Sequence, residues 1–196
     1  AGGPTDVVVA AGRSLTTIRR QLQADPDVVA IAPNFRRELA DDVIDEPGFA
    51  NLWGLDNTGQ RISGTTTRMG KPDVDIDGLQ ALRLGIGSSD IVVAVVDDGI
   101  DFDHPDLADR AWVNPGEADS LAANGIDDDG NGYIDDVNGW DFCNDDATVH
   151  DEGQDGHGTH VAGTIAASLD GRGIVGVAPG ISLMALKFID ESGLCG

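Results

Sequence analysis

Residues 91–96 read IVVAVV, a continuous apolar run that is rich in β-branched side chains. Such a run is typical of a strand that is buried on both faces at the centre of a parallel sheet. Further along the chain, residues 157–168 place small and apolar side chains at helical spacing, and residues 182–189 (SLMALKFI) form a second apolar run of strand length. Strands that alternate with helices predict an α/β fold, with a parallel sheet flanked by helices.

The chain before residue 38 has a pattern of its own. Residues 5–11 and 27–33 are predicted strands, and residues 15–24 between them are a predicted amphipathic helix. Together they make one β-α-β unit, which is too small to be stable alone. Residues 37–50 (RELADDVIDEPGFA) are charged and contain Pro and Gly, so we expect an exposed linker there.

Acidic residues are in large excess, 35 against 12 basic ones, which gives a formal net charge of −23. This excess argues against nucleic-acid binding, because neutralising phosphates requires a basic face. The chain has no run of 18 apolar residues, roughly the shortest length for a transmembrane helix, so no membrane span is predicted. Cys143 and Cys195 could form one bridge or stay free, and two cysteines are too few to define the redox compartment.

Two aspartates, Asp97 and Asp98, follow the first buried run directly and precede Gly99. Functional residues in open α/β sheets lie at the carboxyl ends of strands, so a carboxylate held at this point is a candidate for orienting a histidine. Taken alone, an aspartate that caps a turn explains the pattern at least as well.

His157 lies at the start of the predicted helix, between Gly156 and Gly158. Glycine on both sides allows close approach to the ring, which suits a histidine that faces a substrate. A zinc site that used His157 and His160 would be unusual, because zinc helices space their histidines at i and i+4 with a Glu between them. We therefore expect His160 to be a structural residue.

Five motifs together resemble those of the subtilisin-like serine proteases, the subtilase or peptidase S8 family. They are VAVVDDGI at 93–100, HGTHVAGTIAA at 157–167, GIVGVAPG at 173–180, HPDL at 104–107 and LWGLDNTGQ at 52–60. The resemblance spans residues 52–196, and the histidine motif alone is highly specific. It implies that these residues are the N-terminal part of a catalytic domain, whose subtilisin-like sheet is incomplete here.

The resemblance implies roles for two residues of a catalytic triad. Asp97 would be the triad aspartate and His157 the general base of a serine endopeptidase that acts on proteins or peptides. Asp98 stands where the family usually has Ser or Thr, and this second acid could raise the pKa of the imidazole. The family's G-T-S-x-A/S serine motif and its oxyanion-hole Asn do not occur in this chain. We therefore expect the chain alone to hydrolyse no peptide.

The β-α-β unit resembles the second half of the family's propeptide, an inhibitor and folding chaperone of ferredoxin-like shape; an ordinary α/β appendage is the alternative. VVAIAPN at residues 28–34 matches the way that the propeptide domain ends. Residues 1–38 would then be a propeptide remnant that acts as an intramolecular inhibitor. Residues 39–51 would be a linker with the maturation site, somewhere between Arg36 and Ala50. The resemblance also implies secretion, although the chain does not start with a signal peptide.

Residues 127–136 (DDDGNGYIDD) carry oxygen ligands at the alternating positions that Ca²⁺ prefers. The match to an EF-hand is partial, because Asn138 stands at position 12 in place of the bidentate Glu. A hydrated turn is the alternative, although three adjacent aspartates would repel one another without a cation. We predict a structural calcium ion, and the candidate ligands are Asp127, Asp129, Asn131, Tyr133 through its carbonyl, Asp135 and Asp136.

A second calcium site is implied by the resemblance alone. Asp106 in the HPDL motif matches a calcium ligand of the family, and Asp170 lies in the loop after the histidine helix, where the family places other ligands. Arg172 in the same loop is an objection, unless only its carbonyl faces the ion. The alternative function is a catalytically inactive homologue that binds calcium as an adhesion or structural module.

Overall fold

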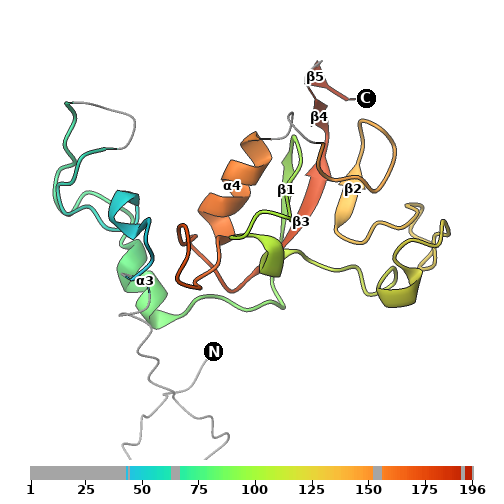
Figure 1. The fold of residues 1–196 in the computed structure, drawn as a ribbon, viewed down its shortest axis with the longest axis horizontal. Coiled ribbons are helices and arrows are strands. Elements are labelled where there is room, and N and C mark those ends of the chain that lie inside the picture. The colour runs from blue at the N-terminus through green and yellow to red at the C-terminus, as the bar shows by residue number, and fades with distance from the viewer. Residues whose placement is uncertain (1–42, 44, 63–66, 152–155, 191–192, 196) are drawn as a thin grey trace, which may run out of the picture. The chain divides into compact units, whose positions relative to one another are not determined.

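The computed structural model describes residues 43, 45–62, 67–151, 156–190 and 193–195 (Figure 1). The chain divides into two units between Arg37 and Glu38, and all of the described residues belong to the second unit. The predicted β-α-β unit therefore lies outside the described residues.

A three-stranded parallel sheet forms the centre of the described structure. Its strands are β1 (Val92–Asp97), β3 (Ser182–Lys187) and β2 (Gly139–Asp141), in the spatial order β1-β3-β2. Helix α4 (His157–Ala166) packs against β1 and β3 (Figure 1). The predicted α/β fold with a parallel sheet is confirmed.

Shorter elements complete the described part of the chain. They are η1 (Phe49–Asn51), α3 (Gly78–Leu84), η2 (Ala108–Arg110), η3 (Asp119–Leu121) and the antiparallel pair β4 (Ile189–Asp190) and β5 (Gly193–Leu194). The single strand predicted over residues 182–189 is thus interrupted at Phe188. None of the described helices has the length and apolar character needed to cross a membrane.

Strand β1 differs from the central, doubly buried strand that its sequence predicts. Within the described residues it lies at the edge of the sheet, and β3 is central. Val92 and Val96 are 39% and 56% exposed, whereas Val95, on the other face, is buried. Both faces of the strand are apolar in sequence, but the described residues cover only one of them, so the predicted double burial is not met within them.

Helix α4 buries a face of small residues. Gly158, Ala162 and Ala166 follow one another at intervals of four, which places them on one side of the helix, and all three are buried. A Cβ added to Gly158 would lie 2.2 Å from the carbonyl oxygen of Gly99, in the turn after β1. The helix can therefore start this close to the end of β1 only because the residue is glycine. The core around it contains Val95, Ile100, Leu107, Ile181, Leu183 and Ala185.

A second apolar cluster corrects the prediction of an exposed linker over residues 37–50. Val43, Glu46 and Phe49 are buried. Val43 and Phe49 pack in one cluster with Leu55, Leu79, Leu82 and Val175. The linker prediction was wrong for these three side chains because it weighed the charged and turn-forming residues of the segment and overlooked its two apolar anchors.

Candidate active site and acidic loop

The carboxyl ends of the three parallel strands carry charged residues in register. Asp97 ends β1, Lys187 ends β3 and Asp141 ends β2, and Lys187 is the register partner of both aspartates. Matching positions of parallel strands direct their side chains to the same face of the sheet. This edge is the place where α/β folds gather functional residues.

Asp97 and His157 lie in direct contact, although 60 positions of the chain separate them. Nδ1 of His157 lies 2.7 Å from Oδ1 and 2.9 Å from Oδ2 of Asp97. Since a carboxylate only accepts hydrogen bonds, Nδ1 donates, and Nε2 of the neutral ring is then unprotonated. The side chain of Asp97 is 16% exposed and that of His157 73%, so the ring is open to solvent while its partner is sheltered.

Asp98 holds the first turn of α4. Its Oδ2 accepts a hydrogen bond from the backbone N–H of His157 at 3.0 Å, and its Oδ1 accepts one from the N–H of Gly158 at 2.6 Å. Two of the backbone donors that a helix leaves unpaired at its N-terminus are thereby satisfied by one carboxylate. The turn after β1 therefore fixes His157 twice, through its ring by Asp97 and through its backbone by Asp98.

The pKa of His157 is raised above its ordinary value of 6.5. The hydrogen bond to Asp97 contributes most, and the negative charge of Asp97 contributes next; desolvation opposes them, and the charge of Asp98 adds a smaller increase. These contacts favour the protonated ring. The arrangement can therefore accept a proton at Nε2 and stabilise the resulting imidazolium beside Asp97.

His160 is exposed, so the expectation that it is a structural residue is wrong for its side chain. Two residues advance an α-helix by about 200°, which places His160 on the side opposite to Gly158 and Ala162. Within the described residues, neither His157 nor His160 belongs to a group of three or more potential metal ligands. The zinc alternative gains no support from this geometry.

The acidic loop offers its carboxylates in two different surroundings. Asp129 and Asp136 each place an oxygen within 4.8 Å of the other and of an oxygen of Glu117. Asp127 instead accepts hydrogen bonds from the backbone N–H groups of residues 130–132, and Asp135 accepts them from those of residues 124 and 125. Glu117 is outside the predicted ligand set, because it lies upstream of the loop and only the fold brings it there.

Asn131 forms a hydrogen bond within the loop, and Tyr133 packs the loop against β2. Oδ1 of Asn131 accepts a hydrogen bond from the N–H of Tyr133 at 2.7 Å. The Tyr133 ring packs against Trp140, with 4.9 Å between the ring centroids, and against Phe142 at 5.9 Å. The loop is thereby packed onto the aromatic side chains of β2 and the residue after it.

Asp106 and Asp170, the second predicted pair of calcium ligands, do not belong to these carboxylate groups. Asp106 is buried and its Oδ2 accepts a hydrogen bond from the N–H of Ile174 at 3.1 Å, whereas Asp170 is exposed and accepts one from Arg172. The loop after α4 is also held by Glu46, whose Oε1 accepts the N–H of Gly171 at 2.8 Å. Glu46 was missed because its segment was interpreted as a linker.

Known proteins share the sequence around this site. The model of the subtilase family matches residues 88–196, which include both Asp97 and His157. The chain belongs to the subtilase family. Subtilisin-like protease 1 of Plasmodium vivax is 36% identical over 145 residues, which are 73% of this chain and 20% of the relative. Fervidolysin of Fervidobacterium pennivorans is 31% identical over 175 residues, 85% of this chain and 21% of the relative.

Solved structures agree with this assignment. The serine protease of Aeromonas sobria, in complex with a chaperone, matches 85% of this chain and 22% of its own with a TM-score of 0.51 and 28% sequence identity. This subtilase chain thus spans about a fifth of the length of the relatives described here.

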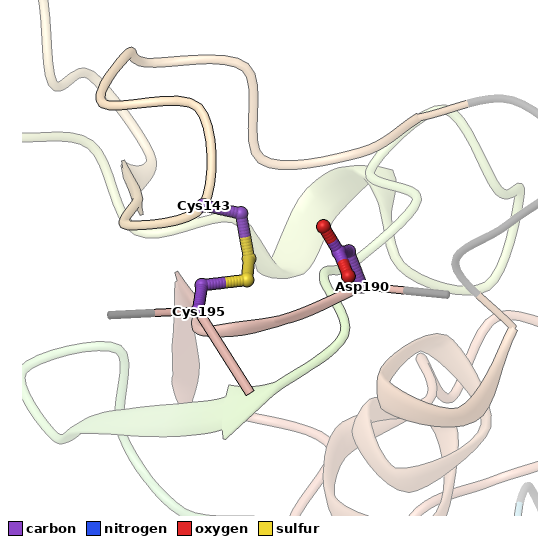
Figure 2. Close-up of side chains that lie close together, drawn as sticks. All are labelled: Cys143, Asp190 and Cys195. Atoms are coloured by element: carbon purple, nitrogen blue, oxygen red, sulfur yellow. A yellow bond between two sulfur atoms is a disulfide. The ribbon is translucent and has the colours of Figure 1, made fainter. Parts of the chain in front are cut away.

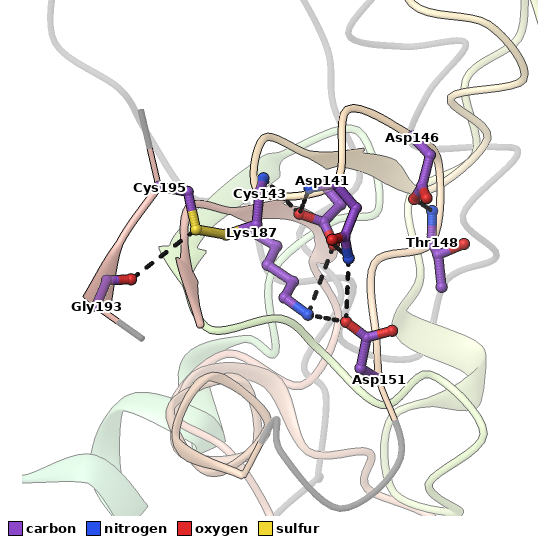
Figure 3. A network of polar contacts seen from close by, with 9 residues as sticks. Asp141, Cys143, Asp146, Thr148, Asp151, Lys187, Gly193 and Cys195 are labelled. Carbon is purple, nitrogen blue, oxygen red and sulfur yellow. Dashed lines mark hydrogen bonds and ion pairs between the residues drawn. A yellow bond between two sulfur atoms is a disulfide. The ribbon is translucent and has the colours of Figure 1, made fainter. Parts of the chain in front are cut away.

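A buried ion network surrounds Lys187, the register partner of Asp97 in this subtilase (Figure 3). Nζ of Lys187 contacts Asp151 and lies 3.5 Å from Oδ2 of Asp141. The side chains of Lys187 and Asp141 are fully buried, and that of Asp151 is 35% exposed. Asp141 also accepts hydrogen bonds from the N–H groups of Cys143 and Asn144. The network joins β2, β3 and the segment that leads to α4.

Cys143 and Cys195 form a disulfide, which resolves the alternatives that the sequence left open (Figure 2). The bridge joins the segment after β2 to the end of the β4–β5 pair, across a sequence separation of 52. Asp190 lies near both sulfur atoms. These three residues are not a metal site, because bridged sulfurs cannot act as thiolate ligands.

Proposed function

We propose that this chain supplies the aspartate and the histidine of a serine endopeptidase that cleaves proteins or peptides. The observation that carries the proposal is the hydrogen-bonded pair of Asp97 and His157 at the carboxyl end of β1. Membership of the subtilase family supports it, because the match includes both residues.

In the proposed mechanism Asp97 holds the imidazole with its proton on Nδ1, so that Nε2 faces the nucleophile. His157 takes the proton of a serine hydroxyl while the serine attacks the peptide carbonyl. It then gives this proton to the leaving amine, and Asp97 stabilises the imidazolium between the two steps. The sequence of this chain contains neither the family's serine motif nor its oxyanion Asn, so those groups must come from elsewhere.

The test compares the 196-residue chain with the full-length protein. We expect no hydrolysis of a labelled peptide by the shorter chain. The longer one should hydrolyse it and lose this activity after reaction with a fluorophosphonate. A longer chain that binds calcium but neither hydrolyses peptides nor reacts with the fluorophosphonate would instead be the inactive, calcium-binding homologue.

We propose further that residues 1–38 are a propeptide remnant and an intramolecular inhibitor, followed by a maturation site in residues 39–51. This part of the proposal rests on the VVAIAPN stretch at residues 28–34, which matches the way that the family's propeptide domain ends. Secretion is part of the same proposal, because the disulfide between Cys143 and Cys195 would persist in an oxidising compartment.

We also propose that the acidic loop binds a structural calcium ion, which stabilises the fold.

Replacing Asp98 with asparagine should lower the pKa of His157. The variant removes one negative charge beside the ring, while its amide oxygen still accepts a backbone N–H. The pKa can be followed by NMR titration of the His157 C2 proton in the 196-residue chain. Asp103→Asn, at an exposed position in the same segment, is the control and should leave it unchanged.

The sign of the pH dependence follows from the raised pKa of His157. Protonation of this ring stabilises the fold at pH values below 6.5, and that contribution disappears as the pH rises through the folded-state pKa. Catalysis needs the neutral ring, so the acidic limb of kcat/KM should lie above pH 6.5 and move to lower pH in Asp98→Asn. An unchanged His157 pKa in this variant would contradict the role given to Asp98.

A further inference from the structure

We infer that Glu117, Asp129 and Asp136 bind one calcium ion, in which Glu117 replaces the glutamate that the loop lacks at its twelfth position. The inference rests on the proposal that the acidic loop binds calcium, and it is independent of peptidase activity. It also separates the loop's carboxylates by role. Asp127 and Asp135 shape the loop, and the ion lies among the other three carboxylates.

Glu117 carries the first part of the argument. Its side chain is fully buried. Oε1 accepts a hydrogen bond from the N–H of Asp128 at 2.7 Å, but Oε2 is buried and has no partner within the described residues. A buried carboxylate is strongly destabilising unless its charge is paired or bound to a metal. Glu117 is therefore a candidate ligand for a cation, and the fold places it beside the acidic loop.

The cluster around Glu117 carries the second part. One oxygen from each of Glu117, Asp129 and Asp136 lies within 4.8 Å of the others, and Asp136 is itself buried. No Lys or Arg of the described residues forms an ion pair with these three carboxylates. Three negative charges at this spacing repel one another strongly in a partly buried site, so a multivalent cation would relieve the repulsion.

The ligand atoms of the cluster indicate the kind of cation. Nδ2 of Asn114 donates to Asp129 at 2.9 Å and to Asp136 at 2.7 Å, and Nδ2 of Asn131 donates to the same two carboxylates. Oδ1 of Asn114 accepts the N–H of Gly116 and Oδ1 of Asn131 accepts that of Tyr133, so both amides direct their donors at the carboxylates and hold them in place. A set of carboxylate oxygens is typical of Ca²⁺ and unsuited to zinc, which prefers nitrogen and sulfur.

Asp127 and Asp135 have partners that explain them without an ion. Asp127 accepts hydrogen bonds from the backbone N–H groups of residues 130–132, at 2.7 to 3.1 Å. Asp135 accepts them from residues 124 and 125. Both carboxylates close turns of the loop, and this places Asp129 and Asp136 opposite Glu117.

An ion bound by this carboxylate cluster would stabilise strand β2 in its place in the fold. Asn114, whose amide donates to Asp129 and Asp136, also donates its backbone N–H to the carbonyl of Val137 at 2.8 Å. Asn138, the next residue, donates to the carbonyl of Trp112 at 2.7 Å. β2 begins at Gly139, so binding at the cluster stabilises the strand whose end holds Asp141.

The test counts bound calcium and measures thermal unfolding for the 196-residue chain and its variants. We expect Glu117→Gln and Asp136→Asn to bind one calcium ion fewer, or to bind that ion with more than about tenfold weaker affinity. Removing a residue that only hydrogen-bonds to a metal ligand already costs about tenfold in affinity, so removing a ligand should cost more. Asp127→Asn keeps an oxygen for the backbone donors, and Asp119→Asn changes an exposed acid outside the cluster. Both should bind as many ions as the wild type.

Melting temperatures, measured with chelator and with calcium, distinguish loss of the bound ion from general destabilisation of the fold. In chelator, Glu117→Gln should be at least as stable as the wild type, because it removes a buried, unpaired charge. In millimolar calcium it should be less stable, because it loses the ion that stabilises the folded state. Undiminished calcium binding by Glu117→Gln, or loss of an ion in Asp127→Asn, would overturn the inference. A wild-type chain that binds no calcium would overturn the calcium proposal itself.

Discussion

His157→Ala should abolish peptide hydrolysis by the full-length protein. The imidazole is the group that Asp97 holds in place to take the proton of the serine hydroxyl, and its removal leaves this step without its general base. In subtilisin itself, a member of the same family, removing the triad histidine lowers kcat by about 10⁶-fold. We expect a loss of the same order, because the contact between Asp97 and His157 places the ring for this role.

The matched control for this experiment is His160→Ala. His160 lies on the same helix, three residues further on, and is exposed on the side away from the core. The two variants should fold alike, as judged by circular dichroism and by calcium binding, while only His157→Ala loses turnover of a labelled peptide. Retention of a tenth of the wild-type rate by His157→Ala, or an equal loss in both variants, would contradict the assignment.

Lys187→Met should destabilise the fold by about 3–5 kcal/mol, the usual penalty for removing one partner of a buried ion pair. Lys187 and Asp141 are both fully buried, and Lys187 also contacts Asp151. Methionine fills similar space but leaves Asp141 charged and buried, with only the neutral donors of residues 143 and 144. The penalty therefore comes from the uncompensated carboxylate more than from lost packing.

Urea unfolding of the 196-residue chain measures this difference. Lys71→Met is the control, because Lys71 is exposed and its replacement should change stability by less than about 0.5 kcal/mol. Adding Asp141→Asn to Lys187→Met should recover part of the loss, since it removes the unpaired charge. Equal stability of Lys187→Met and the wild type would show that Asp141 does not depend on this cation.

The sequence predicted the parts of the fold whose signal is local. The apolar runs identified β1 and β3, and the spacing of small residues identified α4, which the structure confirms. The histidine and aspartate motifs identified the family. These features depend on neighbouring residues alone, so a single sequence contains them.

The features that were missed all depend on contacts between distant segments. Glu117 joins Asp129 and Asp136 only because the chain folds back before β2. Glu46 reaches the loop after α4 across 125 positions. The exposure of Val92 and Val96 on one face of β1 depends on which elements pack against that face, and the composition of the strand does not show this.

The most direct test of the central claim is the tautomer of His157, which ¹⁵N NMR of the selectively labelled 196-residue chain reports. The account predicts a neutral ring protonated at Nδ1, with a pKa above 6.5 that falls when Asp97 is replaced by asparagine. A neutral ring protonated at Nε2, or a pKa that the Asp97→Asn substitution leaves unchanged, would contradict it.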